Sequence, residues 1–308
     1  MAGMGKDPPQ AGPPFTLDHR RQWRDCLYVY PVVSRRSRGL SIGINVNHDK
    51  RCTYSCIYCQ VDRHRPRAAH KVDLLRLRRE MEDVLGEATS GQIWRQERFV
   101  ATPPAMRRLN DIAFSGDGEP TCLPNFDAAV AAAAEVKARM GLEDVKIVVI
   151  TNASQLRSPQ FQAALAVLDA NNGEVWAKLD AGSETHFRRV NRPGEGVTLA
   201  DVVAGITEVA RGRAIVIQSL FIRLGGEGPP GDEVAAYGKR LQDIVAGGGK
   251  IKLVQVYTVA RRPAEPEVAP MSEEGLAAIA QTVRECVPGV AVETYPGSAF
   301  TAPAATEG

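Results

Sequence analysis

Residues 52–59 read Cys-Thr-Tyr-Ser-Cys-Ile-Tyr-Cys, which places three thiols, Cys52, Cys56 and Cys59, within eight positions. A four-iron cluster normally takes one cysteine on each iron, so three cysteines with no fourth nearby would leave one iron open to another ligand. Catalytic metal sites keep such a position open, whereas structural sites are closed. The stretch therefore predicts a reactive [4Fe-4S] site.

A structural zinc site is the main alternative for clustered cysteines. It would need a fourth Cys or His in a paired spacing, and the nearest candidates, His48 and His64, create no familiar zinc spacing. The remaining cysteines, Cys26, Cys122 and Cys286, are scattered, and an isolated cysteine is usually a small buried hydrophobic residue. The spacing thus favours an open iron-sulfur cluster over zinc.

The length of 308 residues suits one large α/β domain, which we place at residues 21–301 between a disordered segment at 1–20 and a flexible tail at 302–308. Six cysteines are too few for a disulfide scaffold, and the proposed site requires reduced thiols, so a cytoplasmic location is expected. No stretch approaches the roughly 20 apolar residues of a membrane span, so no membrane association is expected.

The charge is uneven along the chain. Residues 1–110 hold 20 Lys and Arg against 11 Asp and Glu, a net +9, and the remainder is −7, which together give the overall +2. Such asymmetry is compatible with a polyanionic partner such as tRNA near the cysteines, for which Arg63, Arg65 and Arg67 are candidates. The alternative is a set of solvated helix faces, and the lack of interleaved stacking aromatics favours it slightly.

Short β-branched runs alternate with amphipathic Ala- and Leu-rich stretches, the pattern of repeated βα units around a parallel sheet. Strands are expected at residues 40–46, 111–115, 145–150, 175–179, 214–220 and 251–257, with a further edge strand at 290–294. Helices are expected at residues 72–86, 125–140, 158–170, 199–211, 232–246 and 272–286. The fold class is therefore α/β, a partial (βα)6 TIM-like barrel of parallel strands.

Polar residues follow or end the predicted strands repeatedly. The set comprises the cysteine run, Gly116-Asp-Gly-Glu-Pro120, Thr151, Asn152, Lys178, Asp180, Gln218, Gln255 and Tyr257. Parallel barrels place their active sites at the carboxyl ends of their strands, so we expect these side chains to share one site. Some of them are also explained as ordinary polar residues at strand ends.

The spacing of the three cysteines, with an aromatic residue before the last, resembles the radical S-adenosylmethionine (radical SAM) superfamily. The segment Gly118, Glu119 and Pro120 looks like part of the superfamily's Gly-Gly-Glu-Pro motif, although Asp117 stands at its first glycine. The resemblance implies that this backbone receives the amino group of S-adenosylmethionine and that Tyr58 contacts adenine. Plain packing beneath the loop is an equal alternative for the Tyr58 ring.

Other strand ends suit the same ligand. Lys178 would pair with its carboxylate and Asp180 with its ribose hydroxyls, while neutral hydrogen bonds would come from Thr151, Asn152, Gln218 and Gln255. Arginines after the fourth and sixth predicted strands, at positions 188, 189, 192, 261 and 262, are candidates for gripping an anionic substrate.

The resemblance implies reductive cleavage of S-adenosylmethionine at the cluster and abstraction of a substrate hydrogen, with an external electron donor of the flavodoxin or ferredoxin type. Within the superfamily the chain resembles bacterial relatives of wyosine-type tRNA synthases, so RNA base modification is one candidate reaction. The archaeal synthase's second cluster is held by three cysteines upstream of the radical triad, whereas here only Cys26 lies upstream of the three thiols. Alternatives are an activase of a glycyl-radical enzyme and a noncatalytic iron-sulfur or zinc protein.

Overall fold

The computed structural model describes residues 21–61, 71–261, 263 and 265–297. Its centre is a curved, mostly parallel sheet of eight strands in the order β1-β2-β3-β4-β5-β6-β8-β10. The strands are β1 (Val29–Ser34), β2 (Gly39–Ile44), β3 (Leu109–Phe114), β4 (Lys146–Thr151), β5 (Gly173–Lys178), β6 (Ala214–Leu220), β8 (Lys250–Tyr257) and β10 (Ala291–Tyr295). The segments predicted at 1–20 and 302–308 lie outside the described residues.

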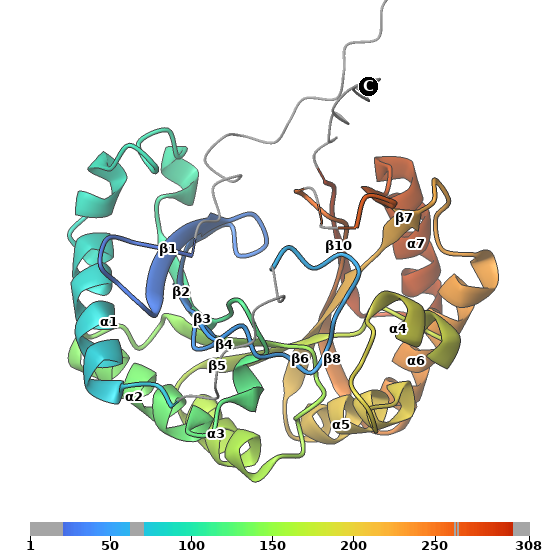
Figure 1. Cartoon of the computed structure of the whole chain (residues 1–308), viewed down its shortest axis with the longest axis horizontal. Coiled ribbons are helices and arrows are strands. Elements are labelled where there is room, and N and C mark those ends of the chain that lie inside the picture. Colours follow the sequence, from blue (N-terminus) through green and yellow to red (C-terminus); the bar gives the residue numbers. More distant parts are fainter. Residues whose placement is uncertain (1–20, 62–70, 262, 264, 298–308) are drawn as a thin grey trace, which may run out of the picture.

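Helices cover the convex face of the sheet, and the cysteine loop crosses its concave side (Figure 1). The long helices are α1 (Leu74–Thr89), α2 (Phe126–Arg139), α3 (Pro159–Ala170), α5 (Leu199–Gly212), α6 (Gly231–Ala246) and α7 (Glu273–Cys286). Side-chain caps fix several of their starts: for example, Asp73 accepts from the backbone of Leu75 and Arg76, and Ser158 from that of Phe161. None of the described helices is long and apolar enough to cross a membrane.

The predicted elements are confirmed. Each predicted strand and helix is present and begins and ends within three residues of its expected bounds. The sequence prediction lacked β1, which pairs antiparallel with β2 at one edge of the sheet. This strand contains Pro31, whose missing N–H is tolerated at a sheet edge. It also lacked helix α4 (Glu184–Val190) and the small antiparallel pair of β7 (Ile222–Leu224) and β9 (Val268–Pro270).

The two faces of the sheet differ because successive side chains on a strand point to opposite sides. Convex-face residues such as Ile112, Phe114 and Val175 join the main core under the helices. On the concave face, Trp176 belongs to a separate small apolar cluster with residues of β3, β4 and β6. The main core stabilises the sheet by roughly 1.5–3 kcal/mol for each fully buried large side chain, and this leaves the concave face to the site.

A polar layer lies on the sheet at the amino end of β5. Glu174 accepts hydrogen bonds from Lys146 Nζ at 2.7 Å, Lys252 Nζ at 2.5 Å and Trp176 Nε1 at 3.0 Å. Burial alone would raise the pKa of the Glu174 carboxyl, but these donors outweigh it and lower the pKa to about 2. The buried carboxylate is therefore kept ionised by one lysine of β4 and one of β8, strands that lie on opposite sides of β5 in the sheet.

Candidate functional site

The cysteine loop is held in place by backbone hydrogen bonds to two distant segments. On one side, Ser55 and Ile57 donate to the carbonyls of Arg192 and Val190 at the end of α4, both at 3.0 Å. On the other side, the N–H of Glu119 donates to the Arg51 carbonyl at 2.9 Å. These bonds satisfy the loop's backbone groups and fix it across the ends of the parallel strands.

Apolar packing anchors the same loop. Ile57 and Tyr58 are buried in a small second core with Val190 of α4, Leu220 of β6 and Val268 of β9. The two residues between Cys56 and Cys59 are therefore not exposed linkers but the hydrophobic anchors of the loop. The pair β7 and β9, which the sequence prediction lacked, supplies part of the surface on which this loop rests.

The three thiols line the same cavity. The Cys52 sulfur accepts contacts from the Tyr54 N–H at 3.5 Å and from Asn152 Nδ2 at 3.6 Å, while Asn191 Nδ2 lies 3.7 Å from the Cys56 sulfur. N–H donors of this kind are typical partners of cluster thiolates. Without a cation, burial raises the pKa of the Cys56 thiol to about 12, and a bound metal would reverse that preference.

A three-cysteine cluster fits this donor set. The thiols come from one anchored loop, face one cavity and have amide donors beside two of the sulfurs. Among the described side chains, no group of three His, Cys, Asp or Glu residues is already drawn together at metal-binding distance. The fit therefore rests on the chemistry of the donors and their shared cavity.

The cavity has a volume of about 380 Å³, within the range of roughly 300–1,000 Å³ that is usual for small-ligand sites. Nine of the thirteen predicted site residues line it: Cys52, Cys56, Tyr58, Cys59, Gly118, Glu119, Thr151, Asn152 and Lys178. The other four, Pro120, Asp180, Gln218 and Gln255, are not among the described lining residues. The strand ends thus converge on one hollow, as the parallel arrangement predicts.

The Gly116–Pro120 loop packs tightly on the chain that leads to the cysteines. A Cβ added to Gly118 would lie 2.0 Å from the Arg51 carbonyl oxygen, and one added to Gly116 would lie 2.1 Å from Asn45 Oδ1. Both glycines are therefore required by close approach. Asp117, which departs from the resembled motif, accepts from Asn45 Nδ2 at 2.8 Å and pairs with Arg21.

The Glu119 side chain is a buried crosslink between two strand ends. Its carboxylate accepts hydrogen bonds from Thr121 Oγ1 at 2.7 Å, Thr151 Oγ1 at 2.6 Å and the Asn152 N–H at 2.6 Å. Burial raises its pKa, and these bonds act against that rise. The Thr151 hydroxyl, predicted as a ligand donor, already donates to Glu119 in this arrangement.

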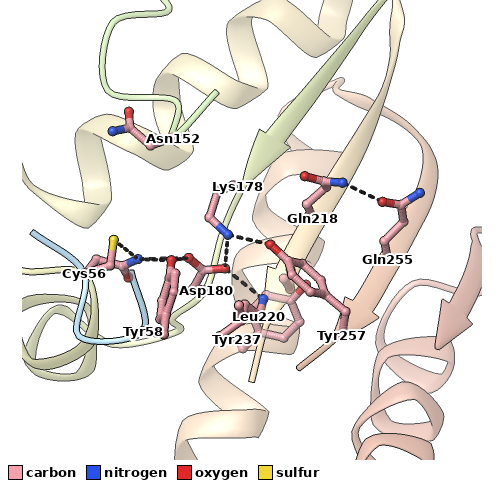
Figure 2. A network of polar contacts seen from close by, with 12 residues as sticks. Cys56, Tyr58, Asn152, Lys178, Asp180, Gln218, Leu220, Tyr237, Gln255 and Tyr257 are labelled. Carbon is pink, nitrogen blue, oxygen red and sulfur yellow. Dashed lines mark hydrogen bonds and ion pairs between the residues drawn. The ribbon is translucent and has the colours of Figure 1, made fainter. Parts of the chain in front are cut away.

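Asp180 is the centre of a second network, which Figure 2 shows. One oxygen accepts from the Leu220 N–H at 2.8 Å and from Lys178 Nζ at 3.3 Å; the other accepts from Asn191 Nδ2 at 2.9 Å and from the Tyr58 hydroxyl. The carboxylate thus ties β5 and β6 to α4 and the cysteine loop. Its ribose role stays a prediction.

Lys178 extends into the cavity from the end of β5. Its ammonium lies 2.7 Å from the Tyr257 hydroxyl and 5.2 Å from the centre of the Tyr58 ring. Burial would lower the pKa of Lys178, but Asp180 and Tyr257 together raise it above its ordinary value. The side chain therefore stays a cation, the charge required to pair with a ligand carboxylate.

Gln218 and Gln255 lie side by side on β6 and β8. Gln218 Nε2 donates to Gln255 Oε1 at 2.7 Å, and both residues are buried (Figure 2). Their predicted contact with a ligand stays untested. The sequence prediction also missed Asn191, whose amide meets both Tyr58 and Asp180; the only signal was its place before Arg192-Pro193-Gly194, a turn sequence that follows an unpredicted helix.

The comparisons with solved structures identify the class of fold, which is that of the radical SAM enzymes. Aligned over 87% of this chain and 68% of the other, a radical SAM methyltransferase from Sphaerobacter thermophilus has a TM-score of 0.59 at 13% identity. SuiB of Streptococcus suis gives 0.54 at 10% identity over 84% and 51% of the two chains. A structure of TYW1 with a lysine-pyruvate adduct gives 0.51 at 13% identity over 81% and 74%.

Sequence comparison finds similar proteins at 25–27% identity. No family model matches the chain. It is 26% identical to the GTPase Obg of Brachyspira hyodysenteriae over 59% of this chain and 23% of that protein. It is 25% identical to a UPF0026 protein of Synechocystis over 58% and 57%, and 27% identical to one of Methanocaldococcus jannaschii over 57% and 47%. The matches thus span from about a quarter to just over half of these relatives' lengths.

Proposed function

We propose that the protein is a radical SAM enzyme that binds a [4Fe-4S] cluster through Cys52, Cys56 and Cys59 and S-adenosylmethionine in the adjoining cavity. The observation that carries the proposal is the convergence of these three thiols with Gly118, Asn152 and Lys178 on one hollow at the carboxyl ends of the strands. The radical SAM fold supports it independently.

When bound, the cluster supplies one electron for reductive cleavage of S-adenosylmethionine, which prepares abstraction of a substrate hydrogen. The chain's own residues bind and orient the ligand. The Gly118 backbone approaches closely because it has no side chain, the Lys178 ammonium supplies a positive charge for a carboxylate, and the Asn152 amide lies between Thr53 and the Cys52 sulfur. The apolar floor around Trp176 would exclude water from a reactive species.

The electron would come from an external donor of the flavodoxin or ferredoxin type, and the required reduced thiols suit the cytoplasm. The test is anaerobic reconstitution with iron and sulfide, then incubation with dithionite and S-adenosylmethionine. Wild-type protein should bind about four irons per chain and form 5′-deoxyadenosine. Cys56→Ala should lose both, whereas Cys286→Ala, on α7 away from the cavity, should retain both.

Two results would contradict the proposal. Iron without binding of S-adenosylmethionine would indicate an electron carrier, and zinc without iron would indicate a structural metal protein. RNA base modification remains one candidate reaction of the proposed enzyme, with tRNA as its anionic substrate. The three arginines at positions 63, 65 and 67 that suggested it lie outside the described residues.

A further inference from the structure

Two adjacent arginines line the cavity at a place that the sequence did not single out. Arg35 and Arg36 lie in the turn between β1 and β2, and both are lining residues together with the Tyr257 side chain. The turn reaches the opposite edge of the sheet, where Arg38 pairs with Glu293 of β10 at 3.2 Å. The hairpin therefore closes one side of the cavity with guanidinium groups.

Each of the two side chains is held by an uncharged group. Arg35 Nη1 donates to the Pro296 carbonyl at 2.9 Å, and the Arg36 guanidinium lies 4.9 Å from the centre of the Tyr257 ring. A carbonyl and an aromatic face orient a guanidinium without neutralising it, and stacking leaves the N–H groups at the edge of the plane available. Both cations are thus positioned by groups that do not cancel their charge.

No carboxylate is paired with Arg35 or Arg36 among the residues that the structure describes. The carboxylates among the described lining residues are engaged elsewhere, Asp111 with Ser41 and Glu119 with its own donors. Burial, together with repulsion from Arg36, lowers the pKa of the Arg35 guanidinium. The like charges therefore oppose each other at a cost that an anion between them would remove.

Two of the five arginines that the sequence favoured for anion binding, at positions 188 and 192, already have carboxylate partners, and a third, Arg261, also lines the cavity. Arg188 pairs with Glu184 at 2.7 Å, and Arg192 pairs with Glu265 at 2.7 Å. Arg262 lies outside the described residues. An arginine that already has a carboxylate partner must give it up to bind a substrate anion, so the hairpin pair is better prepared than Arg188 or Arg192.

We propose that Arg35 and Arg36 form a subsite for a phosphate group of the substrate. Two neighbouring guanidiniums suit the planar, bidentate recognition of phosphate oxygens, and their double charge matches a phosphomonoester or two successive phosphodiesters. This inference rests on the proposed function, since it assigns the substrate class of the same cavity.

The position of the subsite relates it to the proposed chemistry. Tyr257 carries Arg36 on its ring and receives the Lys178 ammonium at its hydroxyl, 2.7 Å away. Lys178 in turn contacts Asp180, which holds Tyr58 of the cysteine loop. One aromatic ring thus separates the phosphate subsite from the residues beside the three thiols, so a substrate anchored there extends toward them.

The test measures binding of uridine 5′-monophosphate and of uridine by calorimetry, because the pair differs only in the phosphate. Wild-type protein should prefer the monophosphate by about tenfold or more, the effect of one or two charge-assisted hydrogen bonds. The double variant Arg35→Gln, Arg36→Gln should lose this preference. Arg157→Gln, which removes an exposed arginine that is not a lining residue of the cavity, is the control and should retain it.

A second arm distinguishes the source of the phosphate. If RNA supplies it, the affinity for unfractionated tRNA should fall in the double variant, and the slope of log affinity against log salt should decrease by about one to two. If only the monophosphate responds, the substrate is a small phosphorylated molecule. Arg36→Lys keeps the charge without the planar guanidinium and should therefore show an intermediate preference for the monophosphate. If the double variant does not fold, this single variant provides the test in its place.

The proposal is overturned if neither probe distinguishes the double variant from wild type, or if Arg157→Gln has the same effect. Because these are binding measurements, they do not depend on cleavage of S-adenosylmethionine. A phosphate preference without any cleavage of S-adenosylmethionine would support the subsite and contradict the enzyme assignment. Cleavage without a phosphate preference would support the enzyme assignment and contradict the subsite.

Discussion

The Tyr58 hydroxyl donates a hydrogen bond to the Asp180 carboxylate, which lies 122 positions later in the sequence. Tyr58 belongs to the cysteine run and Asp180 follows β5, so this contact joins the loop to the sheet at the level of the cavity. Asn191 reinforces it by donating to both partners, at 3.1 Å and 2.9 Å. The geometry of the cysteine loop therefore depends on a carboxylate that does not itself line the cavity.

Replacing Tyr58 by Phe should loosen the cysteine loop. The change removes one buried hydroxyl and leaves an oxygen of Asp180 with a single donor, at an expected cost of about 1–3 kcal/mol in the free energy of unfolding. In reconstituted protein it should also alter the electron paramagnetic resonance spectrum of the reduced cluster. Tyr237→Phe, which removes a buried hydroxyl bonded to Ser219, should cost similar stability and leave the spectrum unchanged. Identical spectra for both variants would contradict the positioning role.

Gly118→Ala should displace the loop after β3. The added Cβ would meet the Arg51 carbonyl oxygen at 2.0 Å, and that oxygen is backbone that also accepts from the Glu119 N–H. We expect a loss of about 1–3 kcal/mol in the free energy of unfolding, the usual range for overpacking, and at least a tenfold loss of affinity for S-adenosylmethionine.

Gly86→Ala is the matched control for this substitution. Gly86 lies inside α1, and an added Cβ would meet nothing within 4 Å. Alanine should therefore stabilise the protein by about 0.5–1 kcal/mol through its higher helix propensity. A stabilising effect of alanine at position 118 as well would show that the close approach to Arg51 is not required.

Glu119→Gln should weaken the crosslink between the ends of β3 and β4. The carboxylate accepts from two hydroxyls and two backbone N–H groups with its two oxygens. In glutamine one of these oxygens is replaced by an amide nitrogen, which cannot accept, so the donors at that position lose their partner. Urea unfolding should show a loss of about 1–3 kcal/mol. Glu195→Gln, on an exposed loop, should change stability by less than about 0.5 kcal/mol. Equal effects of the two substitutions would refute the crosslink.

The buried Glu174 should make stability depend on pH in acid. Its folded pKa of about 2 lies below the ordinary value near 4.5, so its contribution is fully present above pH 4.5 and is lost as pH falls toward 2. Between pH 6 and pH 3 the wild type should lose about 2 kcal/mol more unfolding free energy than Glu174→Gln. Urea midpoints at the two pH values measure this difference, and parallel losses in both proteins would count against the Lys146 and Lys252 pairing.

Most of the elements could be predicted because their signals are local. The alternation on β3, with Ile112 and Phe114 facing the helices, is visible in the sequence, as are caps such as Asp73. The antiparallel strand β1 could not be predicted in the same way because Pro31 interrupts its pattern and only an edge position tolerates it. Helix α4, with seven residues, is too short for a clear helical period.

By itself the sequence determined the order of the parallel strands and the long helices, the three closely spaced thiols and the set of polar residues at the strand ends. Only the tertiary structure decided which of those polar groups face the cavity and which bond to one another. Lys178 faces it, whereas Asp180, two positions later, is used by Tyr58, Asn191 and Leu220. The physical reason is that a buried carboxylate must find donors, and those donors come from segments whose proximity is created by folding.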